Sequence, residues 1–326
     1  MNETPNSSFS SELPELQLGI DSTSLGAFKR CPRAYQLGIL EGWRTAPAES
    51  WPEQWNPAAD LQFGLWMHEG RERYEDWRLE SDSHDEALER TLQWLMEATW
   101  DRKTDRPWAS GNGIKNRFTL VRTLTWYLDK YQDDPLETLR GENGRPMIEH
   151  SFRYDSGYRS RLTGESFLLC GHLDKVGSFQ GSPWLSDLKS TKSGLDRWYV
   201  ETFTPDNQFT LYLVTGHVAL PVKVRGLMLD AAQVLASGAR FERFPIVRTQ
   251  WVLDEWYQDL GMWLRWLEDS VERLVETGRD FPMNDKACFR CEFRGVCSKG
   301  SEGARAEELQ RGFRKRSWDP LQARGE

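Results

Sequence analysis

The stretch from Gly171 to Ser190 reads GHLDKVGSFQGSPWLSDLKS, and it decides the fold. Apolar and β-branched residues flank a Gly/Ser/Pro segment at 177–183, which predicts two short strands joined by a hairpin. Side chains alternate between the two faces of a strand, so Asp187 and Lys189 point the same way and Asp174 can lie beside them on the neighbouring strand. Acids on a small sheet are costly unless they bind something, and hard oxygen ligands favour a divalent cation.

The composition limits the classes of protein to consider. With 326 residues the chain can bury a full core, and its formal net charge of -8 argues against a protein that coats nucleic acid nonspecifically. No apolar run is long enough to cross a bilayer, and the first 15 residues lack the pattern of a signal peptide. We therefore expect a cytoplasmic protein without a membrane contact.

Hydrophobic spacing divides the chain into a helical first part and a mixed second part. Helices are predicted at about 22–37, 61–77, 87–100, 118–131, 205–218 and 253–277. Strands are predicted at about 147–154, 166–176, 184–190, 222–231 and 241–249. This order of elements predicts an α/β or α+β core.

The same pattern suggests how the chain is organised. Residues 1–20 have no hydrophobic period and are expected to form a flexible arm. A single domain is expected at 21–298, followed by a charged tail at 299–326. Its parts would be a helical elaboration at about 21–145, a catalytic core at about 146–280 and a cysteine-rich segment at 281–298. There is no Gly-rich phosphate loop ending in Gly-Lys-Ser/Thr, so nothing indicates an ATP-driven motor.

Asp174, Asp187 and Lys189 together suit phosphodiester chemistry. Paired carboxylates bind Mg²⁺ or Mn²⁺, the metal activates a water, and a lysine can orient that water or stabilise charge on the phosphorus. His68 lies on a predicted helix upstream of the sheet. Gln208 and Tyr212 are four residues apart on the helix after it, so both can reach a nucleotide or the lysine.

The cysteines suggest a second centre. Cys288, Cys291 and Cys297 form a C-x₂-C-x₅-C cluster that needs a fourth ligand. Cys31 is the better candidate, because Cys170 lies in an apolar strand where a free thiol packs as a small hydrophobe. Four thiolates allow either zinc or a [4Fe–4S] cluster.

The combined pattern resembles a known family. The order of its motifs, His68, Gly171-x-x-Asp174, Asp187-x-Lys189 and Gln208-x-x-x-Tyr212, is similar to that of the RecB-like branch of the PD-(D/E)XK nuclease superfamily. The resemblance spans about residues 22–297, although Leu173 stands where the superfamily name has proline. It implies a restriction-endonuclease-like core, in which a mixed central sheet is flanked by helices.

The resemblance also implies roles for individual residues. The metal ligands would be His68, Asp174, Asp187 and the carbonyl of Leu188, and Lys189 would assist the attacking water. The cysteines resemble those of iron–sulfur nucleases related to AddB and to CRISPR-associated RecB-like exonucleases. That likeness implies a [4Fe–4S] cluster rather than zinc, held by the set Cys31, Cys288, Cys291 and Cys297.

These features together predict a metal-dependent DNA exonuclease for single-stranded or frayed ends, in recombination, replication, repair or spacer processing. Predicted DNA contacts are Arg33, Lys192, Gln208 and Tyr212. The alternatives are a non-catalytic DNA-binding scaffold subunit of a helicase–nuclease complex and a structure-specific endonuclease. The expected setting is a prokaryotic or phage-infected cell, with a homo-oligomer or a helicase or recombination partner. Glu149 is either a further acid of the site or an exposed strand residue.

Overall fold

The computed structural model describes residues 16–46, 55, 58–81, 83–141, 144–220, 222–316 and 318–320. The chain divides into two compact units, and each is assembled from segments that are distant in the sequence. The cysteine unit comprises Met1–Thr45, Asp155–Leu168 and Gln258–Pro320. The sheet unit comprises Ala46–Tyr154, Leu169–Tyr257 and Leu321–Glu326.

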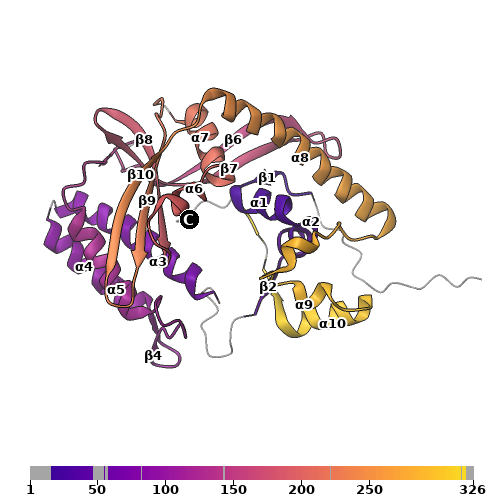
Figure 1. The fold of residues 1–326 in the computed structure, drawn as a ribbon, viewed down its shortest axis with the longest axis horizontal. Coiled ribbons are helices and arrows are strands. Elements are labelled where there is room, and N and C mark those ends of the chain that lie inside the picture. Colours follow the sequence, from indigo (N-terminus) through magenta and orange to yellow (C-terminus); the bar gives the residue numbers. More distant parts are fainter. Residues whose placement is uncertain are drawn as a thin grey trace, which may run out of the picture. The chain divides into compact units, whose positions relative to one another are not determined.

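A mixed sheet of seven strands forms the framework (Figure 1). Its main path is β1 (Gly19–Ile20), β7 (Ser166–Phe179), β8 (Ser182–Thr191), β9 (Leu227–Val234) and β10 (Ala239–Ile246). Two further strands, β5 (Glu137–Thr138) and β6 (Ile148–Arg159), also pair with β7. Strand β8 is antiparallel to β7 and parallel to β9, so the predicted hairpin and the mixed central sheet are confirmed.

Three helices of the sheet unit, α3 (Ala59–Ser81), α4 (His84–Ala98) and α5 (Arg117–Lys130), pack together beside the sheet (Figure 1). They share a core with Leu188 of β8, whose members include Phe63, Met67, Leu120 and Leu124. After β8 come α6 (Arg197–Glu201) and α7 (Asn207–Ala219), and α7 packs against β8. Polar caps fix where these helices begin: Asp206, for example, accepts the N–H of Phe209 at 2.7 Å.

The cysteine unit joins the beginning of the chain to its end. The predicted helix at 22–37 is split into α1 (Ser22–Arg30), α2 (Pro32–Tyr35) and the π-helix η1 (Gln36–Leu40), because Cys31 is extended and Pro32 begins a new helix. The C-terminal elements are η2 (Asp285–Cys288), α9 (Arg294–Cys297), α10 (Glu302–Gly312) and β11 (Phe313–Lys315). Strand β11 pairs with β2 (Trp43–Thr45), and a long helix, α8 (Gln250–Thr277), connects β10 to this segment.

Several predictions about chain organisation can be compared with this arrangement. The first 15 residues of the predicted arm lie outside the described residues, and its end, Gly19–Ile20, forms strand β1. The predicted charged tail at 299–326 contains α10 and β11. A short strand pair, β3 (Trp100–Asp101) and β4 (Arg106–Pro107), lies between α4 and α5 in the sequence. Within the described part of the chain, every helix is too short or too polar to span a membrane.

Candidate active site

Asp174 of β7 lies at the centre of the candidate site. Its Oδ2 atom accepts the backbone N–H of Leu188 at 2.7 Å, and His68 Nδ1 lies 3.0 Å from the same oxygen. A third donor, the Arg71 guanidinium, lies 3.6 Å away. All three of these contacts are made by Oδ2.

Asp187 and Lys189 share one side of β8, as the strand pattern predicts. Lys189 Nζ lies 2.6 Å from Asp187 Oδ2. On the other side of the carboxylate, the Gln208 amide donates to Asp187 Oδ1 at 3.2 Å and to the Tyr212 hydroxyl at 3.0 Å. Of the two predicted DNA contacts, Gln208 therefore binds Asp187 and fixes its orientation, and Tyr212 contacts Gln208.

The electrostatics of the site follow from burial and from these pairings. Burial alone would lower the pKa of His68, but Asp174 raises it to about 9, so the ring is an imidazolium at neutral pH. Burial would likewise lower the pKa of Lys189, yet Asp187 raises it, and the amine stays charged. Burial raises the pKa of Asp187 to about 6. Burial would also raise the pKa of Asp174, but His68 and Arg71 hold it below its usual range.

Glu149 belongs to this site. It is 7% exposed, and its Oε1 atom lies 3.7 Å from His68 Nδ1, so it is not an exposed strand residue. One ligand atom from each of His68, Glu149 and Asp174 lies within 4.8 Å of the others. The backbone of Glu149 has a φ of 45°, a conformation that costs a residue with a side chain about 1–3 kcal/mol and recurs at functional sites.

Two basic residues of the site have no motif in the sequence. Arg71 follows His68 by one turn of α3 and is 3% exposed. Lys115 is 4% exposed. It donates to the carbonyl and the hydroxyl of Ser190, both at 3.0 Å, and Ser190 is the residue after Lys189 on β8. In the sequence, only the helical spacing from His68 could have indicated that Arg71 lies near the site. Lys115 lies in a connection without a recognisable pattern, so its position could not be predicted.

The remaining predicted DNA contacts differ in how accessible they are. Lys192 is partly exposed, and its ammonium lies 3.1 Å from Asp60 Oδ2, where it can still exchange partners. Arg33 is held inside the cysteine unit: its Nε donates to the Phe281 carbonyl at 2.8 Å, and its NH1 pairs with Asp280 at 2.8 Å. With its side chain only 12% exposed, Arg33 supports the fold, so we remove it from the proposed DNA contacts.

The four predicted cluster cysteines all lie in the cysteine unit. Cys31 is buried and accepts the N–H of Asn284 at 3.4 Å. Burial raises the pKa of the Cys291 thiol, and Cys31 and Cys288 raise it further. Burial also raises the pKa of Cys297, with Cys291 and Cys31 adding to the effect. Cys170, by contrast, is 1% exposed within β7.

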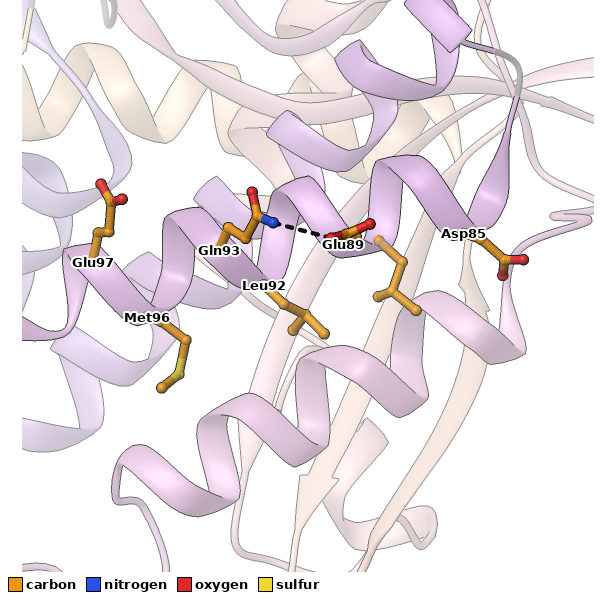
Figure 2. Close-up of a pocket in the computed structure, with 7 residues that line it drawn as sticks. Asp85, Glu89, Leu92, Gln93, Met96 and Glu97 are labelled. Atoms are coloured by element: carbon orange, nitrogen blue, oxygen red, sulfur yellow. Dashed lines mark hydrogen bonds between the residues drawn. The ribbon is translucent and has the colours of Figure 1, made fainter.

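A surface hollow lies along α4 (Figure 2). Figure 2 shows Leu92 and Met96 on one side of the helix, and Gln93 donating to Glu89, at 3.1 Å. Its lining is Asp85, Leu88, Glu89, Leu92, Gln93, Met96 and Glu97. The hollow contains none of the residues predicted for catalysis, and we do not assign it to the active site.

Comparisons with known proteins agree with this chemistry. The family model described as the PD-(D/E)XK nuclease superfamily matches residues 22–298. The chain is similar to a solved structure from Eubacterium rectale provisionally described as an exonuclease, with 12% identity, a TM-score of 0.43, and 86% of this chain and 90% of that chain covered. It is also similar to the solved structure of SSO0001, with 11% identity and a TM-score of 0.29, and the match covers 71% of this chain and 82% of that chain. We draw nothing further from these two distant similarities. No curated protein matches the chain.

Proposed function

Because this chain belongs to the PD-(D/E)XK nuclease superfamily, we propose that it is a metal-dependent DNA exonuclease acting on single-stranded or frayed ends. The observation that carries the proposal is the convergence of two acids and a lysine, Asp174, Asp187 and Lys189, on neighbouring strands. A scaffold subunit without catalysis would not need this arrangement. We place the activity in recombination, replication, repair or spacer processing of a prokaryotic or phage-infected cell, as the resemblance implies.

The donors of the site suit Mg²⁺ or Mn²⁺. Asp174, Asp187 and the Leu188 carbonyl supply hard oxygen atoms, and His68 supplies a nitrogen once its proton has left. A bound ion would polarise the scissile phosphodiester and lower the pKa of a water. Removal of the His68 proton also frees Asp174 from its shortest side-chain contact.

Lys189 acts as a cation in this proposal. Because Asp187 raises its pKa, the ammonium is retained at neutral pH, and it can donate to the attacking water or to a phosphate oxygen. Gln208 keeps Asp187 in place from the opposite side. Lys192, directly after the end of β8, is partly exposed and can bind a neighbouring phosphate of the strand.

We propose that the second centre is a structural [4Fe–4S] cluster held by Cys31, Cys288, Cys291 and Cys297. Burial raises the pKa of Cys291 and Cys297, and the thiols raise one another's pKa further, so the four sulfurs lie close enough to interact, as ligands of one centre must. The sequence separation of Cys31 from the other three means that the cluster would tie α1 to the C-terminal segment. Zinc is the alternative for the same four thiolates.

Nuclease activity can be tested with end-labelled linear and circular single-stranded DNA in Mg²⁺ or Mn²⁺. We expect mononucleotides from linear DNA only, and no product from the Asp187→Ala or Lys189→Ala variants. Glu137→Ala is the matched control, because Glu137 is exposed on β5 of the same sheet. Cleavage of circles would indicate an endonuclease, and cleavage by Asp187→Ala would contradict the assigned site.

The cluster has its own test. Protein purified without oxygen should be brown and contain about four iron and four sulfide per chain. Cys291→Ala should lose the colour and the iron, whereas Cys170→Ala should keep both, since Cys170 packs inside β7. Colourless protein that contains zinc would replace the iron–sulfur proposal with a zinc site.

A further inference from the structure

Glu149 is a buried carboxylate that none of the matching motifs includes. It comes from β6, whereas His68 comes from α3 and Asp174 from β7, so three separate elements bring their ligand atoms within 4.8 Å of one another. The His68 ring connects the other two: its Nδ1 lies 3.0 Å from Asp174 Oδ2 and 3.7 Å from Glu149 Oε1. A single positive group is therefore already held between the two carboxylates.

Another acid lies near Glu149. Glu72, one turn after His68 on α3, is a further acid facing Glu149, and its pKa is raised to about 7, by burial first and then by Glu149. The cations on that side are His68 and Arg71, and Arg71 is also drawn toward Asp174 and Asp230. A further carboxylate is costly in such surroundings unless a cation is bound there.

Asp187 is engaged differently from Glu149. Lys189 Nζ lies 2.6 Å from Asp187 Oδ2, and the Gln208 amide donates to Asp187 Oδ1 at 3.2 Å. Asp174 contacts the surroundings of both carboxylates. It accepts the backbone N–H of Leu188, the residue after Asp187, and it pairs with His68, which also lies beside Glu149. A cation bound by Asp174 could thus take one carboxylate from β8 and another from β6.

We propose that Glu149 is a direct ligand of the divalent cation, together with His68 and Asp174. This inference rests on the proposed nuclease metal site and adds to it a carboxylate outside the motif pattern. Two carboxylates and an imidazole nitrogen form a donor set that suits Mn²⁺. Lys189 and Gln208 already contact Asp187. We therefore expect the cation to bind first to His68, Glu149 and Asp174, and Asp187 to join them as a further ligand.

Direct binding of Mn²⁺ tests the inference without measuring cleavage. The free ion is counted by electron paramagnetic resonance in titrations of the full chain. We expect one Mn²⁺ per chain in the wild type and at least about tenfold weaker binding in Glu149→Gln. Glu137→Gln is the control, because it removes one exposed acid from the same sheet and should bind Mn²⁺ as the wild type does.

The outcomes separate this inference from the proposed function. If the wild type binds no Mn²⁺, or if Asp174→Asn binds as tightly as the wild type, the proposed metal site fails. If Asp174→Asn weakens binding but Glu149→Gln matches Glu137→Gln, only the role of Glu149 is overturned. Should Glu149→Gln not fold, Glu149→Asp takes its place: its shorter carboxylate should weaken binding severalfold, and unchanged affinity would contradict the inference.

Discussion

Arg243 of β10 gives the most informative stability prediction, because its guanidinium forms ion pairs with two carboxylates, those of Asp134 and Asp230. Its Nε donates to Asp230 Oδ2 at 3.0 Å, and its NH2 donates to Asp134 Oδ2 at 3.0 Å. The guanidinium also lies 3.8 Å from the ring centroid of Tyr131. The side chains of Arg243, Asp134 and Asp230 are 12%, 15% and 0% exposed.

Arg243→Met keeps an apolar stem of similar length and removes the charge. Asp230 then loses the cation with which it forms a buried ion pair, a change that typically costs about 3–5 kcal/mol. With a urea dependence of about 2–3 kcal/mol per molar, the unfolding midpoint should fall by roughly 1–2 M. Lys175 still pairs with Asp134 at 3.1 Å, so the loss should be concentrated on Asp230.

Urea unfolding followed by tryptophan fluorescence measures this change. Arg240→Met is the matched control on the same strand, because Arg240 is 63% exposed and pairs with Glu242 at the surface. Its effect should stay within about 0.5 kcal/mol. Adding Asp230→Asn to Arg243→Met should recover part of the loss, since it removes the unpaired charge. Equal midpoints for Arg243→Met and Arg240→Met would refute the reasoning.

Three further predictions concern single side chains and pH. Tyr127→Phe should cost about 1.5–3 kcal/mol in urea unfolding, because it removes a 2.6 Å hydrogen bond to a buried carboxylate. In chelator, the free energy of unfolding should fall as pH rises from 6.5 through about 9, because the folded protein holds a His68 proton that the unfolded chain loses near 6.5. His68→Gln should flatten that dependence. Nuclease activity with Mn²⁺ should fall below pH of about 6, as Asp187 takes up a proton and stops acting as a ligand.

Local patterns were sufficient to predict the catalytic hairpin. Apolar alternation on both sides of a Gly/Ser/Pro turn gives strands β7 and β8, and the period of two places Lys189 against Asp187. Spacing of four along α7 similarly brings Gln208 to Tyr212. These relations extend over a few residues, so propensity and periodicity contain the necessary information.

Other features depend on contacts that local patterns do not contain. Glu149 is buried because β6 pairs with β7 and because its own backbone has a positive φ, and neither property follows from its neighbours in the sequence. Arg33 lies in a basic stretch typical of DNA contacts, yet it binds Asp280, 247 positions later. Each of the two compact units is also assembled from segments that are far apart in the sequence.

The contrast between two buried charge clusters explains why only one of them should bind a cation. In the cluster around Asp230 of β9, each carboxylate contacts a permanent cation. Asp134 forms ion pairs with Arg243 and Lys175, and Asp230 pairs with Arg243 and accepts a hydrogen bond from Tyr127. At the active site Arg71 lies 3.6 Å from Asp174, but the cation that contacts both Glu149 and Asp174 is His68, whose proton can leave. A removable proton makes room for a metal ion, whereas an arginine does not. The first cluster therefore stabilises the sheet, and the second is the one poised for exchange with a divalent cation.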